Sequence, residues 1–340
     1  MARPKSRVAK MGRKWHHISN TLATPLLGRP SDAPIWRVFF FLRKLKLFQR
    51  RKYSKPTLTF QEQLERLESR GLIVSDRGLA LRWLSRVNYY RLSAYLYPFR
   101  LAGADRYQAG TTFEQIAQFY IFDQKLRSLL MDAIQRVEVW LRTAITYELA
   151  HEYGAFGYLK KSNFNRNFDH KTFLKTLEGE FEKSKESFVQ HYREKYTGEN
   201  HLPIWMATEI LTFGTVSVLY SNGLSLESKR KIAQQIGQAD NVLSNWMQSL
   251  TYVRNLCAHH SRVWNRKLAV SPKIPKRNKV GKVDGNRIYG VLLILQILLR
   301  SIAPNNTWKN CVHQLIDAND WIDLAQMGFP SDWKVRDPWK

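Results

Sequence analysis

The feature that most constrains the fold is one long stripe of apolar residues between positions 116 and 149. Its members recur at spacings of three, four or six residues, the periodicity of a helix face that packs on a core over many turns. Thr111-Thr-Phe-Glu114 precedes the stripe and has the form of a capping box, which marks a helix start. We predict one long bundle helix whose core-facing residues are Ile116, Phe119, Tyr120, Leu126, Leu130, Ile134, Val137, Leu141, Ile145 and Leu149.

Helical patterns continue on both sides of this helix. Another capping box, Thr59-Phe-Gln-Glu62, opens a predicted helix that runs through Arg70. Runs of alternating apolar and polar residues, which are typical of strands, are nearly absent, so we predict an all-α helical bundle. The further helices are predicted over residues 77–87, 88–99, 171–196, 204–220, 226–236, 241–260, 287–302 and 310–325.

The chain divides into three predicted parts. Residues 1–55 contain fifteen Lys or Arg and one acidic residue, Asp32, so we predict a mobile basic arm. Within it, residues 35–48 mix bulky apolar and basic side chains, a composition that suits folding on RNA or on a membrane surface. An N-terminal helical subdomain at 56–110 and a larger helical domain at 111–340 follow.

Net charge restricts the partners that this chain can have. Lys and Arg number 54 against 28 Asp and Glu, which leaves +26 at pH 7. Such an excess disfavours a compact state unless a polyanion is bound, so nucleic acid is the first partner expected and an anionic membrane surface the second.

Three further features of the sequence bear on the compartment in which the protein acts. The longest apolar run, residues 289–299, is far shorter than the roughly 20 residues that span a bilayer, so we predict a buried helix and no membrane insertion. Only Cys257 and Cys311 are present, which makes a disulfide framework improbable. The N-terminus lacks the apolar core and small-residue cleavage site of a secretory signal. We therefore expect a cytoplasmic protein.

The chemistry of the chain is predicted to lie at Arg254-Asn-Leu-Cys-Ala-His259. Cleaving RNA without a metal needs a base for the ribose 2′-hydroxyl proton and a cation for the pentacoordinate phosphorane. The unperturbed pKa of histidine, near 6.5, suits the first role, and the always-charged, planar guanidinium suits the second. His259 is thus the predicted base, Arg254 the predicted cation, and Asn255 a group that orients the base or holds a phosphate. We predict no metal and no cofactor.

The spacing of this pair raises a geometric question. Positions five apart on a helix point roughly 140° away from each other, so one helix does not bring the two groups together. A second copy of the chain related by a two-fold axis would supply the missing group, and we therefore predict a homodimer with a composite site. Taken alone, the spacing also fits a basic helix surface that arose by chance.

Neighbouring groups have structural interpretations as well as functional ones. His260 points about 100° away from His259, which favours a hydrogen-bonding role over catalysis. Cys257 is interpreted as a small packing residue. Glu138 and Arg142, four apart on the long helix, fit an ordinary ion pair, and contact with the catalytic histidine is the alternative. Glu209 has the same two interpretations.

An aromatic and basic set of residues is predicted to bind RNA by stacking on bases and contacting phosphates. Core packing of its tyrosines is an equally good interpretation. The set comprises a cluster before the long helix and a Pro-containing basic loop that follows the motif: Tyr89, Tyr90, Arg91, Arg262, Arg266, Lys267, Lys273, Lys276, Arg277 and Lys279.

Several segments, taken in order, resemble the Abi-like family of abortive-infection proteins, a branch of the HEPN superfamily that is related to the nuclease domains of type VI CRISPR effectors. The resemblance covers residues 53–333. The segments are Lys55-Pro-Thr-Leu-Thr59, Gly71-Leu-Ile73, Tyr89-Tyr-Arg-Leu-Ser93, Tyr97-Pro-Phe-Arg100, Arg136-Val-Glu-Val-Trp-Leu-Arg142, Pro203-Ile-Trp-Met206 with Glu209, Phe213-Gly-Thr215, Arg254-Asn-Leu-Cys-Ala-His-His-Ser-Arg-Val-Trp-Asn-Arg266 and Met327-Gly-Phe-Pro-Ser-Asp-Trp333.

The resemblance implies a HEPN-type bundle at 111–340 and a dimeric RNA endonuclease toxin whose products end in a 2′,3′-cyclic phosphate. It implies a role in phage defence and control by a bound non-coding RNA, and it carries the family's Arg and His over to Arg254 and His259. The basic arm lies outside the family pattern. Two other functions remain open from the residues themselves: an RNA-binding module without catalysis, and a membrane-surface effector that uses residues 35–48.

Overall fold

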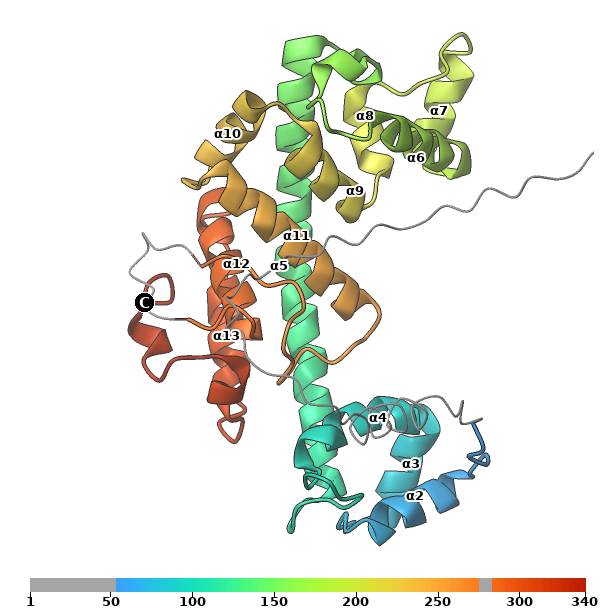
Figure 1. The fold of residues 1–340 in the computed structure, drawn as a ribbon, viewed down its shortest axis with the longest axis vertical. Coiled ribbons are helices and arrows are strands. Elements are labelled where there is room, and N and C mark those ends of the chain that lie inside the picture. Colours follow the sequence, from blue (N-terminus) through green and yellow to red (C-terminus); the bar gives the residue numbers. More distant parts are fainter. Residues whose placement is uncertain (1–52, 275–282) are drawn as a thin grey trace, which may run out of the picture. The chain divides into compact units, whose positions relative to one another are not determined.

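The long apolar stripe forms a single helix, α5 (Phe113–Tyr153), of 41 residues. It is the axis of a computed structural model that describes residues 53–274 and 283–340. At 1.5 Å per residue α5 is about 60 Å long, and Figure 1 shows the other helices arranged along it. Every predicted stripe residue is buried except Tyr120, which is partly buried. The predicted core face of this helix is therefore confirmed.

The start of α5 differs from the prediction. Its N-cap is Thr112, whose hydroxyl accepts a hydrogen bond from the Gln115 amide. The carboxylate of Glu114 accepts from the amides of Ser75 (3.0 Å) and Asp76 (3.2 Å) instead of closing a capping box. The predicted box at Thr111 was wrong because contacts almost forty residues away in the chain compete with the local pairing. The box at Thr59 is confirmed.

The remaining helices gather at three levels of α5 (Figure 1). Near its N-terminal end lie α2 (Phe60–Ser69), α3 (Arg77–Arg86) and α4 (Tyr89–Leu96). Near its C-terminal end lie α6 (His170–Lys183), α7 (Ser187–Lys195), α8 (Ile204–Ile210) and α9 (Phe213–Val218). Along its middle lie α11 (Asp240–Ala258), α12 (Ile288–Ile302) and α13 (Trp308–Asp317). The short helix α10 (Leu226–Gln234) lies beside the C-terminal part of α5, where its Ser228 donates a hydrogen bond to Glu152.

The described ranges contain these twelve α-helices and no β-strand, apart from two isolated bridges, so the predicted all-α class is confirmed. Residues 58–340 form one compact unit. The predicted arm up to residue 52, including the segment 35–48, lies outside the described residues. Within the described ranges, no helix combines the length and the apolarity needed to cross a bilayer.

Three predicted helices were too long. The one over 171–196 breaks at Ser184, which is extended, and the one over 204–220 breaks at Leu211. At the second break, the Thr212 side chain caps α9, and the Arg142 guanidinium donates to the carbonyls of Thr208 and Leu211. The third helix ends at Asp317 rather than at 325. Apolar periodicity alone does not reveal such breaks, because it continues across them.

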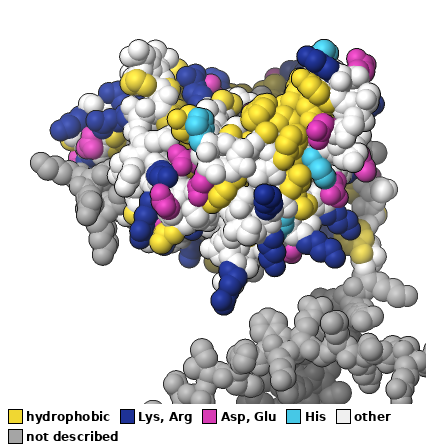
Figure 2. Space-filling view, turned by 90° about the horizontal axis from the view of Figure 1, so that it is seen from above, with side chains coloured by type: hydrophobic (Ala, Val, Ile, Leu, Met, Phe, Trp, Pro, Cys, Tyr) yellow, Lys and Arg dark blue, Asp and Glu magenta, His cyan; other side chains and the backbone are white. Residues whose placement is uncertain are grey.

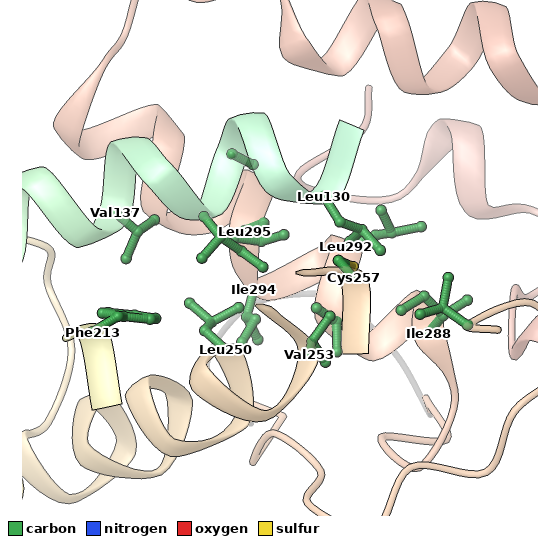
Figure 3. Close-up of a cluster of buried hydrophobic side chains, with 14 of the residues drawn as sticks. Leu130, Val137, Phe213, Leu250, Val253, Cys257, Ile288, Leu292, Ile294 and Leu295 are labelled. Atoms are coloured by element: carbon green, nitrogen blue, oxygen red, sulfur yellow. The ribbon is translucent and has the colours of Figure 1, made fainter. Parts of the chain in front are cut away.

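The central core lies where α5, α11 and α12 meet. Leu130 and Val137 of α5 approach Leu250 of α11, with Leu292 and Leu295 of α12 between them (Figure 3). All are fully buried, and burying each such side chain contributes about 1.5–3 kcal/mol. The apolar run predicted as a buried helix is α12, whose residues from 288 to 299 are all buried. This packing fixes the direction of α11, whose last turn carries the predicted motif.

Candidate functional site

The predicted catalytic histidines lie at the C-terminus of α11. His259 is the C-cap, and His260 follows in the left-handed conformation with φ 55°. The amide of His260 donates to the Cys257 carbonyl (2.9 Å) and that of Ser261 to the Leu256 carbonyl (2.8 Å), the two bonds of a Schellman motif. The chain turns sharply at this point, so both imidazoles are exposed at the tip of the helix.

An open groove of about 690 Å³ lies beside this helix end. One wall is the segment that follows α11, and the other is α4 with the turn after it, about 170 residues earlier in the chain. The lining residues are Asn88, Tyr90, Arg91, Ser93, Ala94, Tyr95, Tyr97, His259, His260, Ser261, Arg262 and Arg266. The fold thus brings six predicted site residues into one groove.

Hydrogen bonds join the two walls directly. The Arg91 guanidinium donates to the His260 carbonyl (2.7 Å), and the Arg262 guanidinium donates to the Ala94 carbonyl (2.6 Å). Burial lowers the pKa of Arg262, but a guanidinium stays charged at neutral pH in any case. Arg266 donates in turn to the Arg262 carbonyl (3.3 Å). The arginines therefore hold the walls together and also make the groove positive.

Two tyrosines of the groove are exposed to solvent. Tyr90 is 83% exposed and Tyr97 is 69% exposed, so their rings are available for stacking. Tyr89, by contrast, is half-buried, and its hydroxyl accepts from Arg70 (2.9 Å) outside the groove. Tyr90 therefore has the exposure that stacking on a base requires, whereas Tyr89 contributes to packing.

Of the two predicted catalytic residues, His259 lines the groove and Arg254 does not. The His259 ring has no hydrogen-bond partner in the described part of the chain, so its nitrogens are available for proton transfer. Arg254 is half-buried and does not line the groove. Its contact is a long hydrogen bond to the exposed Asn255 (3.4 Å), and no carboxylate within residues 53–274 or 283–340 pairs with it. Within one chain, the groove therefore holds the base without the predicted cation.

A buried polar cluster that sequence reasoning missed lies beneath the groove. Asp123 of α5 is fully buried, and one of its oxygens accepts from the amides of Val263 (3.0 Å) and Trp264 (2.6 Å). Its other oxygen accepts from the Tyr95 hydroxyl (2.6 Å) and pairs with Arg127. A signal for this cluster is present in the sequence: positions 123 and 127 continue the apolar stripe between Phe119 and Leu130, and a charged residue in such a stripe indicates a buried partner.

Burial raises the pKa values of two groups near the cluster, the Cys257 thiol and the Tyr95 hydroxyl. It raises the pKa of the Cys257 thiol to about 12, with a smaller contribution from Asp123. The thiol is protonated at neutral pH, which fits the predicted packing role. Burial, and next the Asp123 carboxylate, raise the pKa of Tyr95, so its hydroxyl remains a proton donor to Asp123.

The acidic and basic residues considered as helpers of the histidine lie elsewhere. Arg142 pairs with Glu138 and donates to the Leu211 carbonyl (2.8 Å), so it holds the end of α8. It lies nineteen residues beyond Asp123 on α5, a rise of about 28 Å. Glu209 is exposed on α8. The structure does not gather these three residues with His259.

The two described lysines of the basic loop after the motif do not line the groove. Lys267 and Lys273 are exposed but do not line it, and Lys276, Arg277 and Lys279 lie outside the described residues. Figure 2, which views the molecule from above, shows Lys and Arg spread over that face with Asp and Glu between them. On the view shown, basic side chains do not form one continuous patch.

Comparison with known proteins identifies the family to which this chain belongs. The family model for Abi-like proteins matches residues 82–265, more than half of the chain. The match includes α4, α5, α11 and the segment after α11, and hence both walls of the groove. The chain belongs to the Abi-like protein family, as its motifs predicted. No curated protein and no solved structure matches it.

Proposed function

We propose that this protein is a metal-independent RNA endonuclease, a toxin of an abortive-infection defence system that acts in the cytoplasm. Membership of the Abi-like family suggests abortive-infection defence. The observation that carries the enzymatic part is the groove itself, which is lined by the exposed His259, without a hydrogen-bond partner among the described residues, and by Arg91, Arg262 and Arg266. This combination of a proton acceptor with several fixed cations suits attack on a phosphodiester.

The proposed reaction uses the 2′-hydroxyl of RNA as its nucleophile. His259 takes the proton from this hydroxyl, and the 2′-oxygen bonds to the adjacent phosphorus. The bond from phosphorus to the 5′-oxygen breaks, and that oxygen takes a proton from water as it leaves, while the protonated His259 returns its proton to the solvent. The products are a 2′,3′-cyclic phosphate and a free 5′-hydroxyl. Guanidinium groups stabilise the charge that develops on the non-bridging oxygens.

A homodimer would complete the site. Arg254 has no carboxylate partner among the described residues and lies outside the groove of its own chain. In our proposal it reaches the groove of a second copy, next to that copy's His259, with Asn255 beside it. A structured non-coding RNA bound at the same cationic groove would keep the toxin inactive by occupying it.

Incubation with RNA tests the enzymatic proposal directly. The wild-type protein should cut single-stranded RNA in the presence of excess EDTA and leave ends that carry a cyclic phosphate. A substrate with deoxyribose at the cut position should stay intact, because it lacks the nucleophile. Cleavage of that substrate, or loss of all cleavage in EDTA after co-purified nucleic acid has been removed, would contradict the proposal.

One observation favours a second candidate, an RNA-binding module without catalysis. The groove of a single chain contains cations but lacks Arg254, and Arg91 and Arg262 are already engaged by backbone carbonyls. This candidate predicts RNA affinity that falls with salt, together with RNA ends that do not change on incubation.

A further inference from the structure

Asp123 is the point at which three elements of the site meet. It belongs to α5, it binds the backbone of the segment after α11 through Val263 and Trp264, and it binds α4 through the Tyr95 hydroxyl. Arg127, one turn further along α5, balances its charge and also donates to the Tyr95 hydroxyl (3.1 Å). Burial raises the pKa of the Asp123 carboxyl, and its four partners, all of them hydrogen-bond donors, act in the opposite direction by favouring the ionised form.

The segment that Asp123 binds has an unfavourable backbone conformation. His260 (φ 55°) and Asn265 (φ 45°) are the two non-glycine residues with positive φ in the described part of the chain. Residues with a Cβ atom adopt this conformation less often than glycine, although Asn and His are enriched among them, and surrounding contacts help to hold it. The two amides bound by Asp123 lie between these positions. Trp264 adds a second anchor, because its ring stacks on Phe119 with centroids 4.1 Å apart.

The opposite wall depends on the same carboxylate. Tyr95 is the residue of α4 that reaches Asp123, and it is 1% exposed. The next residue towards the N-terminus, Ala94, accepts the hydrogen bond of Arg262 from the other wall. A change at the Asp123 carboxylate is therefore transmitted to both sides of the groove.

We infer that Asp123, acting through Tyr95 and the amides of Val263 and Trp264, is a positioning residue that sets the distance between the groove walls and the place of the His259 ring. Asp123 does not touch the substrate. The part of this inference that concerns catalysis rests on the proposed endonuclease function, whereas the part that concerns the walls does not.

Tyr95→Phe tests the inference with a minimal change, since it removes one oxygen and keeps the packed ring. Tyr158→Phe is the matched control: Tyr158 is also 1% exposed, and its hydroxyl donates to a backbone carbonyl, that of Leu202 (2.7 Å), away from the groove. For both variants we would measure thermal unfolding, amide hydrogen exchange of the peptide 259–266, and kcat and KM for RNA cleavage.

We expect both variants to lose thermal stability, Tyr95→Phe somewhat more, because the Tyr95 hydroxyl makes two hydrogen bonds and the Tyr158 hydroxyl makes one. Only Tyr95→Phe should exchange faster at 259–266, and only it should lose kcat, by about tenfold with KM little changed, since small misplacements of a reacting group are costly. Equal exchange and equal kcat in the two variants would overturn the inference. If the wild type does not cleave RNA, the proposed function fails, and the exchange comparison still decides whether Asp123 positions the walls.

Discussion

The groove and the cluster beneath it are adjacent but built in opposite ways. In the groove, His259 is exposed and its ring has no hydrogen-bond partner within residues 53–274 and 283–340, and Tyr90 is largely exposed. In the cluster, Asp123 has no exposed surface, and its polar partners among the described residues are all hydrogen-bond donors. Free polar groups are available for chemistry, whereas satisfied buried ones fix structure. Substitutions in the groove should therefore reduce activity, and substitutions in the cluster should reduce stability.

The largest effect expected is on activity. His259→Ala should lower the rate of RNA cleavage by about 10³-fold, the typical contribution of a general base, with the melting temperature unchanged because the ring has no partner in the described structure. Cleavage of a labelled RNA, followed in a gel assay, measures it. His191→Ala is the control, since His191 is an exposed histidine on α7. Equal activity in the two variants would remove His259 from the chemistry.

The next effect is on stability. Asp123→Ala leaves the buried Arg127 uncompensated, and breaking such a pair costs about 3–5 kcal/mol. Urea denaturation measures the free energy of unfolding. Asp132 and Arg136 form the same i,i+4 pair on the same helix, but each side chain is nearly half exposed, so Asp132→Ala should cost less than about 1 kcal/mol. Similar losses of unfolding free energy in both variants would mean that the buried pair contributes no more to stability than the exposed one.

A smaller effect concerns the binding of RNA. Arg266→Ala should lower the slope of log affinity against log salt concentration by about 0.7, the value for one phosphate contact on a single strand. Fluorescence anisotropy with labelled RNA at several salt concentrations gives the slope. Arg230→Ala, an exposed arginine on α10, should leave it unchanged. A slope that changes equally in both would indicate binding by overall charge rather than in the groove.

The smallest expected effect is on stability and concerns the backbone at His260, between the groove and the buried cluster around Asp123. His260→Gly should be more stable than His260→Ala by about 0.5 kcal/mol. Alanine keeps the left-handed cost of about 1–2 kcal/mol, and the freedom of glycine in the unfolded chain offsets up to about 1 kcal/mol of the difference. Both variants lack the imidazole, so a comparison of their unfolding free energies isolates the backbone. Greater stability of the alanine variant would show that φ at 260 is not strained.

The sequence predicted features that depend on local contacts, and it missed features that depend on contacts between distant segments of the chain. Local patterns were reliable where one helix face meets the core, as along α5, or where a cap is satisfied within one turn, as at Thr59. They failed where a distant group competes. Glu114 binds the amides of Ser75 and Asp76, and Arg142 takes carbonyls at a helix break that periodicity does not mark.

In the candidate site, too, some residues could be predicted from the sequence and others could not. His259 and Arg91 were proposed from short motifs, and the fold places both in one groove. Asp123 was missed because its partners come from segments that lie 28 and 140 residues away, and only tertiary structure brings them together. A charged residue within an apolar stripe is the sequence signal that would have found it.

The most direct test of the central claim is complementation between two inactive chains. Arg254→Ala and His259→Ala proteins are each expected to be inactive, and they would be mixed under conditions that allow subunits to exchange. If the site is composite, half of the dimers are mixed and each holds one intact site, so cleavage should return to about a quarter of the wild-type rate. No recovery, with subunit exchange demonstrated independently, would contradict a site shared between two copies of this chain.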